Sequence, residues 1–240
     1  MLAAAQSGDW DAMDRAVREF QGAMMAMKYA AKPVVAAPFQ RVLGGGCEVV
    51  LHAAKVQASA ELYLGLVEVG VGLIPAGGGC KELIARLKDP RRVFELIGMA
   101  KVSSCAEDAR AMGLLDRQAG ISMNAERLIE DAKRAALALA REYKPGLPRT
   151  DIKVTGESGY AAMRLGAWMM RQAGYITEYD MVIAEKLAHI LSGGRLSGEP
   201  LVSEQHLLDL EREAFLSLSG DARTHARMEH MLKTGKPLRN

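Results

Sequence analysis

The 240-residue sequence is poor in the features that mark several classes of protein. Aromatic residues make up only 5%, and no basic run is interleaved with them, so the base-stacking groove of a single-strand-binding protein is not expected. The formal net charge is +2, which gives no reason to expect a nucleic acid or an acidic membrane surface as a partner. No uncharged apolar run approaches the roughly 18 to 20 residues that cross a bilayer. Binding to nucleic acid and insertion into a membrane are therefore not expected.

Cysteine is scarce as well. Cys47, Cys80 and Cys105 are an odd number at wide spacing, and neither a CxxC pair nor a Cys/His cluster with metal-ligand spacing accompanies them. No metal site is predicted, and unpaired thiols suit a reducing compartment. The first ten residues, "MLAAAQSGDW", lack the basic region and the apolar stretch of a signal peptide. We therefore expect a cytoplasmic protein.

The order of the predicted elements indicates an α/β core followed by an α-helical region. Short apolar runs alternate with helical patterns up to residue 142, and the Pro/Gly-rich "YKPGLPRT" (143–150) indicates a linker. We therefore divide the chain into a core at 1–142, a linker at 143–150 and a helical region at 151–240. The helices predicted after the linker span 158–172, 178–191, 203–218 and 221–233.

Within the core, Asp9 is expected to cap a helix whose apolar residues recur at helical spacing as far as Met27. The β-branched run "KPVVAAPF" (32–39) predicts a buried strand, and shorter strands are predicted at 55–59 and 62–64.

Two glutamates stand in the least polar segments of the chain. Glu48 lies in "VLGGGCEVVLHAA" (42–54), and Glu68 is the only charged residue between Leu62 and Cys80. Burial of a carboxylate is costly, and no lysine or arginine lies near either residue in sequence. Two explanations remain open, namely a structural ion pair with a distant base and a general acid/base pair whose pKa is raised by burial.

The triple glycine at 44–46 separates a predicted strand from the helix that carries Glu48. Such a turn directs unpaired N–H groups at the positive end of the helix dipole into the space ahead. Phosphate cradling is not indicated, because GxGxxG fails at Val49 and "GGGCKE" lacks the hydroxyl of GxxxxGK[ST]. The Gly45 N–H is instead a candidate donor to a developing oxyanion, with tight helix–strand packing as the alternative. One amide donor and two carboxylates suit chemistry beside a thioester carbonyl.

The segment "KPVVAAPFQRVLGGGCEVVLHAAKVQASAELYLGLVEVGVGLIPAGGGCKEL" resembles the centre of the crotonase, or enoyl-CoA hydratase/isomerase, superfamily. The similarity continues through "KVSSCAEDARAMGLLD" and covers about residues 10–120. The C-terminal "HLLDLEREAFLSL…ARMEHMLKTGKPLRN" resembles the end of bacterial fused proteins in which a 3-hydroxyacyl-CoA dehydrogenase part precedes a crotonase-like part. The resemblance implies an α/β crotonase-like fold (a ββα superhelix of the ClpP/crotonase type), incomplete at its N-terminus, with a C-terminal helical region.

The resemblance also implies roles for individual residues. Gly45 matches the glycine whose amide forms half of the oxyanion hole, Glu48 the base that activates water, and Glu68 the group that exchanges a proton with the α-carbon. The residues expected to bind substrate are Leu43, Gly44, Gly46, Leu73, Pro75 and Ala76. Two departures affect the pocket. An alanine stands at 76 where hydratases commonly have glycine, and "APFQRV" replaces the usual Asn-Gly turn. His52 is expected to be a packed histidine rather than a catalyst.

The implied activity is hydration of trans-2-enoyl-CoA to 3-hydroxyacyl-CoA in fatty-acid β-oxidation. The substrate is an acyl-CoA thioester, and no cofactor is expected on this part, with NAD only where a dehydrogenase part is present upstream. An isomerase or an acyl-CoA hydrolase on the same scaffold remains an alternative. A third possibility is a non-catalytic module that docks on a 3-hydroxyacyl-CoA dehydrogenase. Homo-oligomers are common in the superfamily and are expected by resemblance.

The second oxyanion donor of the superfamily comes from an upstream loop, typically Gly-Ala-Asp or Gly-Ala-Asn, that does not precede Met1 here. The sequence therefore predicts a chain that is truncated at its N-terminus. We expect the isolated chain to fold incompletely or to assemble with neighbours, and to be weakly active or inactive.

Overall fold

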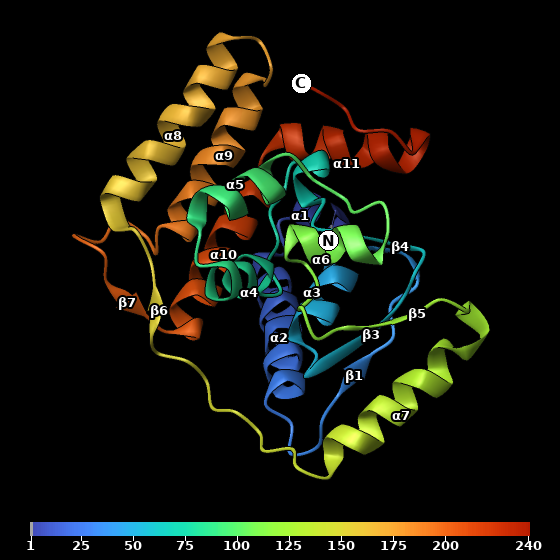
Figure 1. Cartoon of the computed structure of the whole chain (residues 1–240). Helices are drawn as coiled ribbons and strands as arrows, with labels where there is room; N and C mark the ends of the chain where they lie inside the picture. The colour runs from blue at the N-terminus through green and yellow to red at the C-terminus, as the bar shows by residue number, and fades with distance from the viewer. Residues whose placement is uncertain (1) are drawn as a thin grey trace.

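The computed structural model describes residues 2–240, which fold into short parallel strands surrounded by helices (Figure 1). One sheet has three parallel strands in the order β1-β3-β5, and a second pairs β2 with β4 in parallel. The strand bounds are Val35–Ala36 for β1, Gln40–Leu43 for β2, Lys55–Ser59 for β3, Leu62–Gly65 for β4 and Gly120–Ser122 for β5. Parallel neighbours need crossover connections, which here run through helices and loops. The α/β class predicted from the sequence is confirmed.

The helices of the first part begin and end where their local signals place them. Asp9 accepts a hydrogen bond from the Ala12 N–H at the start of α2, as the sequence predicted. Pro90 occupies the first turn of α5, where its missing N–H has no intrahelical acceptor to lose. The bounds are α1 Leu2–Ser7, α2 Trp10–Lys28, α3 Gly45–His52, η1 (3-10) Glu68–Val71, α4 Gly79–Leu87, α5 Pro90–Gly98, α6 Ala106–Met112, η2 (3-10) Ala125–Arg127 and α7 Leu128–Ala140.

The C-terminal part is almost entirely helical. Strands β6 and β7 form a short antiparallel pair. β6 precedes and β7 follows the hairpin of helices α8 and α9, which projects from one end of the molecule (Figure 1). The four helices predicted after residue 150 are all present. The bounds are β6 Ile152–Lys153, α8 Gly156–Gln172, α9 Glu178–Leu191, β7 Leu201–Val202, α10 Glu204–Ser219 and α11 Ala222–Thr234.

Helices from both sides of the irregular segment 143–149 share one hydrophobic cluster. Leu51 of α3 and Leu83 of α4 belong to the same cluster as Leu187 of α9 and Leu218 of α10. Helix α10 packs against α2, α4 and α9, so the C-terminal part contributes directly to the packing around α3 and α4. Within residues 2–240, no helix combines the length and the apolar character that a membrane span requires.

Gln21 joins three parts of the core. Its side chain is only 4% exposed, and its Nε2 donates to the carbonyl oxygens of Ala76 and Leu208, each at 2.8 Å. These two bonds attach α2 both to the turn that precedes α4 and to α10. A buried carbonyl that loses its donor bears a desolvation penalty, so this side chain cannot be replaced by an apolar one of similar size without loss.

We expect the substitution Gln21→Leu to lower the free energy of unfolding by about 2 kcal/mol, because it leaves the buried Ala76 carbonyl without its donor and removes the bond that ties α2 to the Leu208 carbonyl of α10. Chemical denaturation monitored by circular dichroism measures the change. The exposed Gln6, which donates to Glu229, provides the matched control Gln6→Leu, expected within about 0.5 kcal/mol of the wild type. Equal losses in the two variants would contradict the role given to Gln21.

Candidate active site

The triple glycine forms the sharp turn between β2 and α3. Gly44 has φ 58° and ψ −128°, a conformation that side chains strongly disfavour, and its N–H donates to the Gly65 carbonyl at 3.0 Å. Helix α3 begins at Gly45, whose N–H lies in the first turn and so has no intrahelical acceptor. Within residues 2–240 this N–H has no acceptor, so the position offers the free amide that an oxyanion donor requires.

Glu48 is held by the backbone of a second glycine-rich segment. The residue is 2% exposed, and its Oε1 accepts hydrogen bonds from the N–H groups of Gly77 and Gly79, both at 2.8 Å. Its Oε2 has no hydrogen-bond partner among residues 2–240, and no Lys or Arg of this part of the chain forms a salt bridge with the carboxylate. The ion-pair explanation is therefore not supported for Glu48.

Glu68 lies beside the turn that opens α3. The parallel register of β2 and β4 places Leu43 opposite Gly65, three residues before Glu68, which begins η1. A Cβ atom on Gly44 would stand 3.3 Å from Glu68 Oε1. The other oxygen, Oε2, is buried without a hydrogen-bond partner among the described residues. Native proteins rarely leave a buried polar atom unsatisfied, and such atoms are often functional.

Burial raises the pKa of both carboxyls. Loss of hydration lifts the pKa of Glu48 from 4.5 to about 7, against the opposing effect of the Gly79 and Gly77 amides and of Lys81. Loss of hydration also lifts the pKa of Glu68 to about 8, and the negative charge of Glu48 adds to this rise. Because each charge disfavours the other, the pair holds one proton near neutral pH.

The Phe20 ring brings the two glycine-rich segments together. A Cβ on Gly45 would lie 3.4 Å from Phe20 Cζ, and one on Gly77 would lie 2.2 Å from Phe20 Cε1 and 2.7 Å from Glu48 Oε2. Only glycine fits at position 77, because any side chain would displace the ring or the carboxylate. In the sequence, Phe20 is one of the apolar residues that recur at helical spacing as far as Met27, and that pattern gave no sign of a place beside the site.

The remaining expected substrate-binding residues divide into two groups. Leu73, Pro75 and Ala76 are buried beside the Gly77–Gly79 turn, with the Ala76 carbonyl bonded to Gln21. Leu43 lies at the end of β2 and is 37% exposed, while Gly46 follows Gly45 in the first turn of α3. The structure therefore gathers Gly44–Gly46, Glu48, Glu68 and the segment 73–79 in one place, and their roles toward a substrate stay predictions.

Comparison with known proteins identifies relatives of this chain. No protein-family model matches the chain. A Bacillus subtilis (strain 168) protein named "Probable 3-hydroxyacyl-CoA dehydrogenase" is 50% identical over 249 residues, which is 100% of this chain but 31% of that protein. A Mycobacterium tuberculosis (strain H37Rv) "Probable enoyl-CoA hydratase" is 30% identical over 175 residues, covering 73% of this chain and 57% of that protein. The crystal structure of an enoyl-CoA hydratase from Mycobacterium avium subsp. paratuberculosis matches 95% of this chain and 73% of its own, with a TM-score of 0.61 and 15% identity.

The chain belongs to the crotonase superfamily. A Rickettsia felis protein named for the trifunctional enzyme of a fatty acid oxidation complex is also similar, at 26% identity over 97% of this chain and 30% of that protein. The chain thus spans about a third of the length of these two relatives.

A buried charge cluster beside the candidate site was not predicted. Lys81 Nζ, with no exposed surface, contacts Glu82 Oε1 at 2.5 Å and Glu204 Oε1 at 3.2 Å, and Lys28 Nζ contacts the same two oxygens at 2.6 Å. A usable signal was nevertheless present in the sequence. Lys28 continues the buried stripe of α2 that runs through Met24, at the spacing of a helical turn.

His52 connects this cluster to the helix of Glu48. Its Nδ1 lies 2.7 Å from the Glu48 carbonyl, which can only accept, so Nδ1 carries the proton and Nε2 accepts from Lys81 Nζ at 3.0 Å. Burial, followed by the charge of Lys81, lowers the pKa of His52 to about 4. His52 is therefore a neutral packed histidine, as expected from the sequence.

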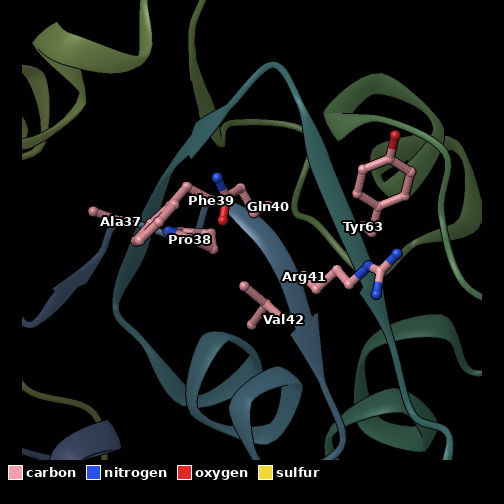
Figure 2. A pocket seen from close by; sticks show the side chains of 7 residues that line it. All are labelled: Ala37, Pro38, Phe39, Gln40, Arg41, Val42 and Tyr63. Atoms are coloured by element: carbon pink, nitrogen blue, oxygen red, sulfur yellow. The ribbon is translucent and has the colours of Figure 1, made fainter. Parts of the chain in front are cut away.

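A separate hollow of about 660 Å³ lies over β2 and β4 (Figure 2). Figure 2 shows the Arg41 side chain extending toward β4, the strand that carries Tyr63. Gln40 at its edge has φ 52°, a left-handed conformation that glycine adopts at lower cost. This is the "APFQRV" segment, where the sequence departs from the superfamily, and the hollow includes neither Glu48 nor Glu68.

The raised pKa values predict how stability depends on pH. Both carboxyls have folded pKa values above 4.5, so they favour the folded state while protonated, and this advantage is lost as pH rises through about 7 and about 8. Between about pH 5 and about pH 8, the free energy of unfolding should fall by about 3 kcal/mol or more relative to the Glu48→Gln/Glu68→Gln variant. Denaturant titrations across this range measure the difference. Glu61→Gln, at an exposed position, is the matched control, and parallel pH curves for the wild type and the double variant would contradict the prediction.

Proposed function

We propose that the chain carries the enoyl-CoA hydratase chemistry of its superfamily and adds water to trans-2-enoyl-CoA in fatty-acid β-oxidation. The observation that carries the proposal is the pair of carboxyls, the buried Glu48 and the partly buried Glu68, that flank the Gly45 amide, with no basic side chain within residues 2–240 bonded to either. A structural role alone requires neither the raised pKa values nor the adjacent glycine amide.

The two carboxyls divide the proton transfers between them. Glu48 ionises at the lower pKa, and its Oε2 takes a proton from water as the water oxygen attacks the β-carbon. Glu68 remains protonated up to about pH 8 and gives its proton to the α-carbon. The Gly45 N–H donates to the thioester oxygen, on which enolate-like charge develops between the two steps. After the reaction Glu48 is protonated and Glu68 is ionised. One proton therefore has to pass from Glu48 to Glu68 before the next cycle.

The proposed substrate is an acyl-CoA thioester, and we assign no bound cofactor to this part. Two of the relatives carry names that refer to a dehydrogenase or to a trifunctional fatty acid oxidation enzyme, and this chain matches about a third of each. We infer that the chain works beside a 3-hydroxyacyl-CoA dehydrogenase part, which would bind NAD. Association into homo-oligomers and a cytoplasmic location complete the proposal.

Substitution of each carboxyl tests the assignment. Glu48→Gln and Glu68→Gln should each lower kcat for hydration of crotonyl-CoA by about a hundredfold or more, because each removes one of the two proton transfers. Loss of absorbance of the conjugated thioester measures the rate. Glu61→Gln, at an exposed position of the same charge, is expected to match the wild type.

The outcomes separate the alternatives. Loss in only one of the two variants, together with migration of a double bond in a 3-enoyl-CoA substrate, would favour an isomerase. Release of free CoA from a saturated acyl-CoA would favour a hydrolase. A chain whose wild type neither hydrates nor isomerises, but binds a 3-hydroxyacyl-CoA dehydrogenase equally well in all variants, would be a docking module.

The two pKa values also predict a pH profile. The value of kcat/KM should be greatest between about pH 7 and about pH 8, because Glu48 has to be ionised and Glu68 protonated in the free enzyme. Activity should fall below this range as Glu48 gains a proton, and above it as Glu68 loses one. Initial rates at low substrate concentration across the range measure the profile. A rate that rises steadily through about pH 9 would rule out Glu68 as the acid.

A further inference from the structure

Glu211 of α10 is another buried carboxyl near the site, and no step of the proposed reaction uses it. The residue has no exposed surface. Its Oε2 accepts from the Gly78 N–H at 2.9 Å, and its Oε1 accepts from the Lys81 N–H at 2.7 Å. Both donors belong to the glycine-rich segment that opens α4, which is 130 or more residues away in the sequence.

The amides of this segment are shared between Glu211 and Glu48. The N–H groups of Gly77 and Gly79 donate to Glu48, whereas the intervening Gly78 donates to Glu211. Successive amides thus point to opposite sides, toward α3 and toward α10. Gly78 has φ 108°, a conformation from which side chains are excluded, and a Cβ there would lie 2.9 Å from the His52 ring.

A carboxyl group is the side chain that suits this position. Each of its two oxygens can accept a hydrogen bond, which matches two converging N–H groups. An amide of the same size would place an NH2 group against one of these N–H donors. Burial raises the pKa of Glu211 well above its ordinary value, and the charge of Glu48 adds to this, while the two amides and Lys81 oppose it.

We propose that Glu211 is a positioning residue for Glu48, which acts by holding the Gly77–Gly79 turn so that two amides converge on the Glu48 carboxylate. Glu211 reaches the reaction centre only through this turn. Its effect on rate rests on the proposed function, whereas its effect on the geometry of the turn does not. The C-terminal helical part would in this way complete the site of the crotonase-like part.

The first test measures the turn itself. In ¹H–¹⁵N spectra, amide protons that donate to a carboxylate resonate downfield, so Gly77 and Gly79 should be displaced in the wild type and move upfield in Glu211→Gln. Glu213→Gln, an exposed position on the same helix, is the matched control and should leave both signals unchanged. Unchanged Gly77 and Gly79 signals in a folded Glu211→Gln variant would overturn the proposal.

The second test separates positioning from a general loss of structure. With crotonyl-CoA, Glu211→Gln should lower kcat by about a hundredfold, the effect of displacing a catalytic group by about 1 Å, and leave KM nearly unchanged. In a Glu48→Gln background the same substitution should lower kcat no further, because the group that it positions is gone. Additive losses, or a loss confined to KM, would overturn the proposal.

A milder variant keeps the proposal testable if Glu211→Gln does not fold. Glu211→Asp retains both acceptor oxygens and withdraws them by one methylene, so smaller upfield shifts of Gly77 and Gly79 and a smaller fall in kcat are expected. Wild-type signals and kcat in this variant would overturn the proposal. If the wild type shows no hydration at all, the proposed function fails, and the amide signals alone still decide the role of Glu211.

Discussion

The partial compensation of one buried charge sets the chemistry of this molecule. Removal of water from the Glu48 carboxylate raises its pKa, and two backbone amides at 2.8 Å return part of the lost solvation. Full compensation would keep the pKa low and make a weak base, whereas no compensation would keep the group neutral. The balance leaves a carboxylate that is ionised at about pH 7 yet still takes up a proton readily. The glycines at 77 and 79 are needed because only their bare backbone can approach so closely.

The neighbouring cations are kept from neutralising this charge. Lys81 is close enough to lower the pKa of Glu48, but its ammonium group contacts Glu82 and Glu204 instead. Lys28 contacts the same two carboxylates, so two positive and two negative charges balance within the cluster. Ion pairs of this kind add little net stability but are costly to break, and they hold α2, α4 and α10 in one arrangement. The raised pKa of Glu48 therefore depends on residues that do not contact its carboxylate.

Local sequence patterns were sufficient to single out Glu48, Glu68 and the glycine triplet. They were insufficient for the buried glutamates behind them, Glu204 and Glu211. Glu48, Glu68 and the glycine triplet stood out because charge and glycine interrupt apolar runs within a few positions of one another. Glu204 and Glu211 are separated from that region by more than 120 residues, and no short pattern states such a pairing. A weaker signal did exist, because both glutamates fall on the buried stripe of α10 formed by Leu207, Leu208, Ala214, Phe215 and Leu218. A carboxylate on the apolar face of a helix is the same anomaly that marked Glu48. The two glutamates of α10 could have been recognised by it, but the distant residues to which they bond could not.

The placement of Glu211 changes how the helical C-terminal part relates to the crotonase-like core. The predicted boundary at 143–150 separates the chain by composition, yet the hydrogen bonds that shape the turn around Glu48 cross it twice through one side chain. Gln21 adds a third connection, since it bonds both to the residue before that turn and to α10. A turn that is hydrogen-bonded to α2, α3 and α10 has little freedom to move, and a rigid turn is what two amides aimed at one carboxylate oxygen require. The glycines give this segment access to the carboxylates, and the helices around it remove the flexibility that glycines would otherwise bring.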